Sequence, residues 1–181
     1  MAQVILGIDP GSRKMGYGVV RMEGNELHYL GSGCIVTGTE ALHKRLLVIF
    51  DAVSAIIEQF APNQMAIEET FVAKNVQSTI KLSESRAVAM VVGARAGLDV
   101  FEYTPMQIKQ AVVGYGAAQK EQVQYMVKNI LHLNGLPQSD AADALACAIC
   151  HGYTHKVSRV LGQPQGAISS INGRWRSATK W

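Results

Sequence analysis

Four carboxylic acids are the residues of this chain best able to do chemistry together. Two of them, Asp9 and Glu68, each end a short apolar run. The other two, Asp140 and Asp143, stand three residues apart at the start of a predicted helix. Carboxylates gathered in one place raise one another's pKa unless a cation lies among them, and oxygen ligands favour Mg²⁺ or Mn²⁺ over zinc. Because carboxylate-held pairs of such ions support in-line attack on phosphodiesters, the set predicts a metal-dependent nuclease.

Each acid also has a purely structural interpretation. Asp9 precedes a proline, as is typical of turns, and Asp at a helix start satisfies free amides, which is worth ~0.3–1 kcal/mol. Either Glu68 or its neighbour Glu69 could be the acid that joins Asp9. Strand alternation sends neighbouring side chains to opposite faces of the sheet, so only one of them can share the face of Asp9, and we choose Glu68. The small residues around Asp140 and Asp143 let that helix face press closely on a sheet. The four acids together are therefore more specific than any one of them.

The apolar pattern predicts an α/β fold with a mixed five-stranded sheet and helices on both faces. Three strands follow one another as an antiparallel meander, and two more alternate with helices. We expect strands at 4–8, 16–22, 27–37, 64–68 and 99–103, and helices at 40–60, 76–97, 105–113, 119–133 and 139–155. Asp9 and Glu68 then emerge at the carboxyl ends of strands, where α/β proteins place their sites.

Length and composition indicate one globular domain followed by a basic tail. Of the 181 residues, 48% are hydrophobic, which is enough for a core without disulfides. We place the domain at 1–156 and a disordered tail at 157–181, where the periodicity is lost. The net charge is +3, and the tail holds four basic residues and no acid, so the rest of the chain carries −1. Such a tail either adds sequence-independent affinity for DNA or is simply a solvated end.

The first residues and the three cysteines bear on the compartment. No basic stretch precedes a long apolar run at the N-terminus, and no segment approaches the ~20 apolar residues of a membrane span. We therefore expect a cytoplasmic protein with no membrane contact and with free thiols. Cys147, Cys150 and His151 match the C-x-x-C-H pattern of haem attachment. They lie in an alanine-rich predicted helix, however, and small buried side chains explain them better.

Several motifs together resemble the RuvC family of Holliday junction resolvases over roughly residues 3–155. They are LGIDPGS at 6–12, GYGV at 16–19, AIE at 66–68, KQ at 109–110 and DAADALA at 140–146. The resemblance implies a ribonuclease-H-like fold and a homodimer that cuts four-way DNA junctions symmetrically, leaving 5′-phosphate and 3′-hydroxyl ends. It also implies two Mg²⁺ ions in each subunit, with Mn²⁺ as a substitute. A branch-migration helicase complex of the RuvA and RuvB type is the implied partner.

The same resemblance assigns roles to individual residues. The catalytic acids and metal ligands would be Asp9, Glu68, Asp140 and Asp143, and the DNA contacts would be Phe71, Lys74, Lys109 and Lys120. Phe71 could stack on a base at an opened junction, worth ~1–3 kcal/mol, or pack in the core. Each lysine could contact a phosphate or be an ordinary solvated side chain. The resemblance favours Lys109 and Lys120 over Lys74.

The predicted helix at 76–97 is apolar nearly all round, so it is either deeply buried or shared with a second subunit.

The sequence leaves other functions open. An actin- or sugar-kinase-like phosphotransferase has the same kind of sheet, and residues 9–16 resemble its phosphate-binding hairpin, but such enzymes normally need two domains. A ribonuclease-H-like nuclease acting on RNA would use the same acids. A junction-binding protein without cleavage would need a broken acid set, and this set is intact.

Overall fold

The computed structural model describes residues 2–70 and 75–161. Its strands are β1 (Gln3–Asp9), β2 (Lys14–Glu23), β3 (Glu26–Val36), β4 (Gln64–Glu68) and β5 (Asp99–Tyr103). Its helices are α1 (Leu42–Phe60), α2 (Val76–Arg95), α3 (Pro105–Val113), α4 (Lys120–Ile130) and α5 (Ser139–Leu161). Every predicted strand and helix is confirmed in this order. Within the described ranges, no helix is long and apolar enough to cross a membrane.

The five strands form one mixed sheet in the order β3-β2-β1-β4-β5. β1 pairs antiparallel with β2, which pairs antiparallel with β3, so the predicted meander is confirmed. β1 also pairs in parallel with β4, and β4 with β5. The carboxyl ends of β1, β4 and β5 therefore meet at one edge of the sheet, with β1 at its centre.

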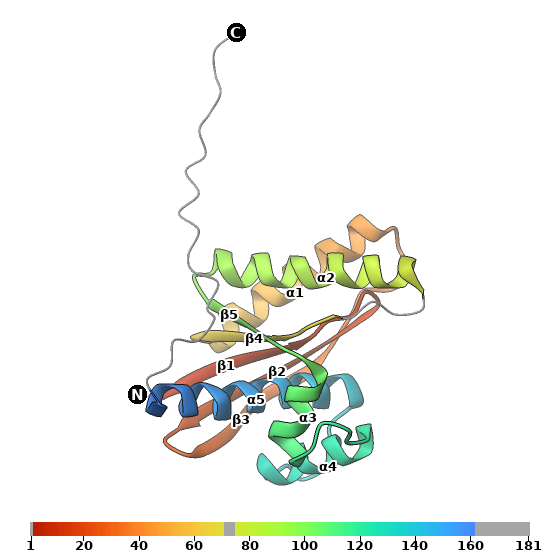
Figure 1. Ribbon diagram of the computed structural model, residues 1–181. Coiled ribbons are helices and arrows are strands. Elements are labelled where there is room, and N and C mark those ends of the chain that lie inside the picture. The colour runs from red at the N-terminus through yellow and green to blue at the C-terminus, as the bar shows by residue number, and fades with distance from the viewer. Residues whose placement is uncertain (1, 71–74, 162–181) are drawn as a thin grey trace.

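Helices cover both faces of this sheet (Figure 1): α1 and α2 lie on one side, and α5, flanked by α3 and α4, lies on the other. A hydrophobic core lies on each face of the sheet, and alternate residues of β1 pack into one core or the other. Ile5 packs on the α5 side, whereas Leu6 and Ile8 pack on the side of α1 and α2. All three are fully buried, which explains why the first apolar run does not alternate.

Glycines on β1 and β2 let helix α5 lie directly on the sheet. A Cβ added to Gly7 would come within 2.1 Å of the Ala144 carbonyl oxygen. One added to Gly16 would come within 2.0 Å of the Asp140 carbonyl oxygen. Only a residue without a side chain tolerates such an approach. The first turns of α5, which carry Asp140 and Asp143, are thereby fixed against the sheet.

The helices differ in detail from the expectation, and α4, for example, ends at Ile130 rather than at 133. α5 continues to Leu161 rather than ending near His155, since neither proline nor glycine occurs between Tyr153 and Leu161. The domain boundary at 156 stays a prediction, because residues 162–181 lie outside the description. Helix α2 is buried on one side only, and on its outer side Val91 is 60% exposed. It is therefore not deeply buried as a whole.

Candidate active site

The sheet register places two of the predicted acids side by side. β1 and β4 run in parallel, and Ile8 of β1 lies opposite Ile67 of β4. Asp9 and Glu68 are the next residues on these neighbouring strands. Both strand ends are partly buried, so the two carboxyl groups emerge together from the core.

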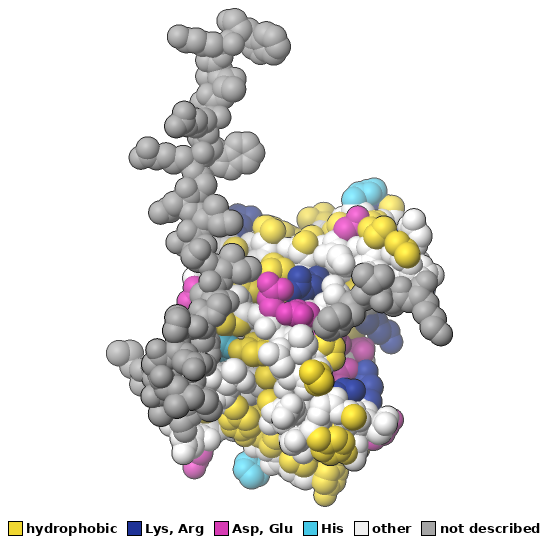
Figure 2. Space-filling model, in the orientation of Figure 1, with side chains coloured by type: hydrophobic (Ala, Val, Ile, Leu, Met, Phe, Trp, Pro, Cys, Tyr) yellow, Lys and Arg dark blue, Asp and Glu magenta, His cyan; other side chains and the backbone are white. Residues whose placement is uncertain are grey.

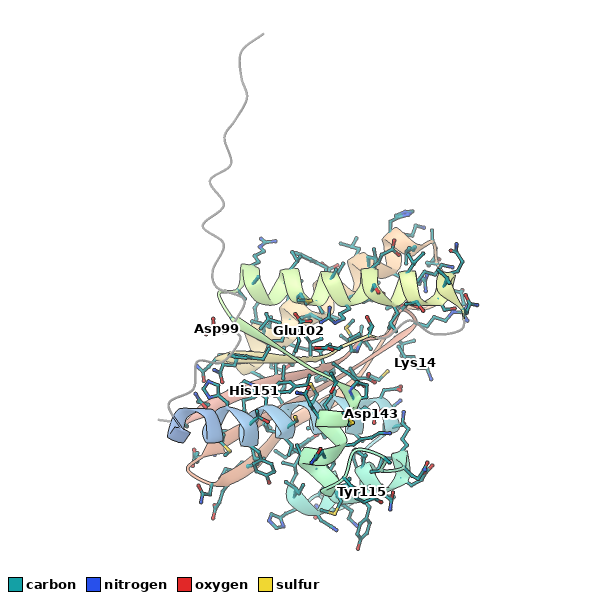
Figure 3. All side chains as sticks on the ribbon, in the orientation of Figure 1. Lys14, Asp99, Glu102, Tyr115, Asp143 and His151 are labelled. Carbon is teal, nitrogen blue, oxygen red and sulfur yellow. The ribbon has the colours of Figure 1, made fainter. Side chains whose placement is uncertain are left out.

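One cleft of about 340 Å³ collects most of the predicted site residues. It is lined by Asp9, Glu68, Asp143, Lys109 and Lys120, together with Pro105, Ile108, Val123 and Ala146. We call this the acidic cleft. Asp143 comes from α5, Lys109 from α3 and Lys120 from the first turn of α4. Acidic and basic side chains also mingle along the right-hand edge of Figure 2, at the end of the molecule where Figure 3 labels Asp143.

Asp140 lies beside the acidic cleft rather than in its lining, as far as the described residues define it. Its Oδ2 atom is 3.6 Å from the thiol sulfur of Cys34, which can donate a weak hydrogen bond. The charge of Asp140 nevertheless raises the pKa of both Asp9 and Asp143. The structure therefore brings three of the four acids into one cleft and holds the fourth close by.

Burial and mutual repulsion raise the pKa of the clustered acids. Burial, followed by the charges of Glu68 and Asp143, raises the pKa of Asp9 to about 8. Burial, followed by the charge of Asp143, raises the pKa of Glu68 to about 7. Burial also raises the pKa of Asp143, although Lys120 opposes that rise. Full ionisation of this cluster is unfavourable until positive charge joins it.

Lys120 supplies one such positive charge. Its Nζ atom lies 2.7 Å from Oδ2 of Asp143. Burial lowers the pKa of Lys120, but the hydrogen bond and charge of Asp143 outweigh that effect and raise it overall. The lysine is consequently protonated at neutral pH. Its charge also lowers the pKa of Asp9 and Glu68, so a single ammonium group acts on three carboxyl groups.

The chemistry of the acidic cleft suits a hard divalent cation. Its ligand atoms are carboxylate oxygens, and neither histidine nor cysteine is among its described lining residues. Within the described parts of the chain, no three histidine, cysteine or acidic side chains already converge closely enough to hold an ion. A cation bound by Asp143 would have to share that carboxylate with Lys120 or displace the lysine.

Most of the chain matches a known protein family. The family model described as crossover junction endodeoxyribonuclease RuvC matches residues 5–151. The chain belongs to the RuvC family. A RuvC from Vibrio cholerae is 55% identical over 174 residues, 96% of this chain and 99% of the relative, and one from Photobacterium profundum is 53% identical over 173 residues, again 96% and 99%.

Solved structures agree with the RuvC assignment. The structure of T. thermophilus RuvC in complex with Holliday junction substrate has 34% sequence identity and a TM-score of 0.82, covering 86% of this chain and 96% of that one. The ribonuclease-H-like fold expected from the resemblance is therefore confirmed. A yeast mitochondrial Holliday junction resolvase shares this fold at 12% identity, with a TM-score of 0.63 and coverage of 87% and 82%.

The DNA-contact residues expected of a RuvC protein divide into two groups. Lys109 and Lys120 line the acidic cleft, and the charge of Lys109 lowers the pKa of Glu68. Phe71 and Lys74 lie outside the described residues, so their roles stay predictions. The two lysines come from different helices, and only the folded chain brings them to the same acids.

Sequence analysis missed one residue that supports the RuvC acids. Arg86 of α2 donates from Nε to the backbone carbonyl oxygen of Glu68, 3.0 Å away. The same guanidinium forms an ion pair with Glu102 of β5. Arg86 thereby ties the end of β4 to helix α2 and strand β5. A single arginine on a predicted helix carries no signal of such a role, because the contact depends on how the helix crosses the sheet.

The C-x-x-C-H pattern has the structural role that we expected. Cys147 and Cys150 are buried free thiols in α5. His151 is also buried, with Nδ1 2.7 Å from the Tyr103 hydroxyl and Nε2 2.9 Å from Oε1 of Gln64. Both ring nitrogens therefore have hydrogen-bond partners in the core. The prediction of free, buried cysteines is confirmed.

Proposed function

We propose that this chain is a Mg²⁺-dependent endonuclease that resolves four-way DNA junctions. The observation that carries the proposal is the convergence of three acids and two lysines in the acidic cleft, at the carboxyl ends of the central strands. The T. thermophilus relative was solved in complex with a Holliday junction, and we extend that substrate to this chain. Family membership supports nuclease chemistry, and the carboxylates support a hard cation as cofactor.

In this proposal Asp9, Glu68 and Asp143 hold two Mg²⁺ ions, with Mn²⁺ as a substitute. Asp140, from the first turn of α5, joins them when its carboxylate leaves the thiol of Cys34. The chemistry that such ions would supply, when held by these carboxylates, is activation of the attacking water and stabilisation of the leaving 3′-oxygen. The raised pKa values of Asp9 and Glu68 support the proposal, since they report a site where added positive charge is stabilising.

The lysines and the apolar lining prepare the site for a phosphodiester. The side chain of Lys120 is 51% exposed although its Nζ reaches Asp143, so the ammonium group can also meet a phosphate. Lys109 lines the same cleft, and its charge lowers the pKa of Glu68. Two cations at its rim attract the DNA backbone toward the acids. Ile108 and Val123 restrict water around the charged groups and strengthen these interactions.

We further infer that the chain acts as a homodimer in the cytoplasm. A two-fold dimer matches a junction of two-fold symmetry. The outer side of α2 supports this inference, because Ile80 is 46% and Val91 60% exposed there. The resemblance adds Phe71 and Lys74 as DNA contacts and a helicase complex of the RuvA and RuvB type as the partner that delivers the junction.

The experiment that tests the proposal is a nicking assay on a synthetic mobile four-way junction. The protein is incubated with the junction, with matched duplex DNA and with structured RNA, each with Mg²⁺ and with chelator. We expect paired, symmetric nicks in the junction alone, with ends that a ligase reseals, and none in chelator. Cleavage of the RNA but not the junction, or nicking that persists in chelator, would contradict the proposal.

A further inference from the structure

A second cleft, of about 860 Å³, opens beside the turn that follows β1. The turn contributes Ser12 and Arg13, and Lys14 is the first residue of β2. Helix α1 contributes Arg45, and helix α2 contributes Ser78 and Lys81. We call this the basic cleft. None of these residues lines the acidic cleft. The catalytic proposal above therefore leaves the basic cleft without a role.

The charge of the basic cleft is strongly positive. Four cationic side chains line it, while Glu40 is the one acid among its described lining residues. The carboxylate of Glu40 is 3.2 Å from Nζ of Lys44, so it is already paired. Like charges in one cleft repel one another, and an anion among them would relieve that repulsion.

Arg45 is the strongest sign that the basic cleft receives an anion. The residue is only 7% exposed, and its Nη1 donates to the carbonyl oxygen of Ser12 at 2.9 Å. Its Nε is buried and has no hydrogen-bond acceptor among the described residues. A buried guanidinium without an acidic partner is costly, because it has lost water and gained too little in return. Arg45 lines the basic cleft, so an anionic ligand there would supply its guanidinium with the negative partner that it lacks.

The start of helix α1 adds backbone donors to the same place. Ala41 and Leu42 both line the basic cleft. Ala41 is the N-cap residue and provides no side-chain hydrogen bond, and the first turn of α1 contains no acid. Free amides and the positive end of the helix dipole favour an anion, and phosphate is the common ligand of such sites.

The basic cleft lies next to the catalytic edge of the sheet. Lys14 follows Asp9 by five residues, and Figure 3 shows Lys14 and Asp143 at the same end of the sheet. Strand β3 connects the two regions: the thiol of Cys34 lies 3.6 Å from Oδ2 of Asp140, and Val36, two residues further along the strand, pairs with Lys14 of β2. A polyanion bound at the acidic cleft can therefore continue into the basic one.

We propose that the basic cleft binds a backbone phosphodiester of a junction arm adjacent to the strand that is cut, with Arg45, Lys14 and Lys81 as its ligands. The inference rests on the proposed function, since it assumes that the substrate is junction DNA. The volume favours a segment of nucleic-acid backbone over a lone phosphate ion, which would leave most of about 860 Å³ unfilled.

The first test measures junction binding in chelator, so that no strand is cut, by fluorescence anisotropy over a range of salt concentrations. Lys14→Gln and Lys81→Gln change exposed side chains and leave the core intact. Each should weaken binding several-fold and reduce the slope of log K against log salt by about 1. Lys128→Gln removes the same charge on α4, away from the basic cleft, and should leave the slope unchanged. Arg45→Lys keeps the positive charge but loses the planar guanidinium, which can donate two parallel hydrogen bonds to a phosphate, so it should also weaken binding.

The second test identifies the phosphate. A methylphosphonate removes the charge of one phosphodiester, and it is placed in turn at successive positions of the junction arms. At one position, the methylphosphonate should lower the junction affinity of wild-type protein but not that of Lys81→Gln, because the two changes remove the same contact. The inference would be overturned if the losses of affinity were additive at every position and the salt slopes of Lys14→Gln and Lys81→Gln equalled that of Lys128→Gln.

Two further outcomes are distinguishable. If inorganic phosphate raises the melting temperature of wild-type protein but not of Lys81→Gln, and no methylphosphonate position is coupled to Lys81, the basic cleft takes a free anion and the inference is wrong. If wild-type protein neither binds nor cuts junctions, the proposed function itself fails. Junction cutting by wild-type protein without any effect of the basic-cleft variants refutes only the inference.

Discussion

Replacing Gly7 with alanine should displace helix α5 from the sheet without changing any of the four acids, and so tests whether the position of α5 matters for cleavage. The new Cβ would lie 2.1 Å from the Ala144 carbonyl oxygen and 2.8 Å from the Ala148 amide nitrogen, whereas real Cβ contacts essentially never fall below 3.0 Å. Backbone atoms cannot rotate away, so α5 must retreat by about 1 Å, which is typical of overpacking that costs about 1–3 kcal/mol. In a chain of this size, that loss lowers the melting temperature by about 2–12 °C. A displacement of about 1 Å also carries Asp143 away from Asp9, and such misplacement costs about 100-fold in rate.

The assay combines thermal denaturation with single-turnover cleavage of a four-way junction at 25 °C, where the variant is still folded. Gly135→Ala is the matched control, because nothing lies within 4 Å of its added Cβ and Gly135 is exposed. We expect Gly7→Ala to bind the junction in chelator but to cut it about 100-fold more slowly, while the control behaves as wild type. Wild-type cutting by Gly7→Ala would refute the idea that close packing of α5 positions the acids.

Two further predictions concern buried titrating groups. Asp9→Asn should raise the melting temperature of the metal-free protein at pH 7–8. The folded-state pKa of Asp9, about 8, lies above the ordinary aspartate value of 3.8, so the fold loses stability as the pH rises between these two values. Differential scanning calorimetry in chelator tests this, and a lower melting temperature would contradict it. The pH dependence of stability that comes from His151 has the opposite sign. Burial, followed by the charge of His155, lowers the pKa of His151 from 6.5 to about 3. The fold therefore loses stability as the pH drops from 6.5 to 3, by up to about 1.4 kcal/mol per pH unit. Urea titrations from pH 7 to 4 should give a shallower pH slope for His151→Gln than for wild type, and equal slopes would contradict the assignment.

The sheet was largely predictable because its signals are local. β4 and β5 begin and end at the predicted residues, since each is a short run closed by polar or turn residues. The start of α3 was equally clear: Thr104 caps it in a capping box with Gln107, and Pro105 is its first residue. The exposed side of α2 depends on tertiary packing, which the apolar pattern alone does not define. The apolar pattern also fades before α5 ends, although no proline or glycine stops the helix before Leu161.

The candidate site was predictable only in part. Alternation along the strands places Asp9 and Glu68 on one face, as the sequence predicts, whereas the pairing of β1 with β4 that sets them side by side is a feature of the folded sheet. The difference between Asp143, inside the acidic cleft, and Asp140, beside it, depends on the rotation of α5 about its axis. The hydrogen bond from Arg86 to the Glu68 carbonyl and the basic cleft join segments far apart in the chain. No short motif encodes such contacts.

The most direct measurement compares Glu68→Gln with Glu69→Gln in junction cleavage. The two residues are neighbours with the same side chain, but only Glu68 lines the acidic cleft, whereas the backbone amide of Glu69 donates to the Tyr103 carbonyl oxygen at 2.9 Å. We predict that Glu68→Gln loses cleavage by more than about 100-fold in Mg²⁺ while still binding the junction in chelator, because the cation loses an oxygen ligand. Glu69→Gln should cut as wild type does. Normal cutting by Glu68→Gln, or equal loss in both variants, would contradict the assignment of the acidic cleft as the catalytic centre.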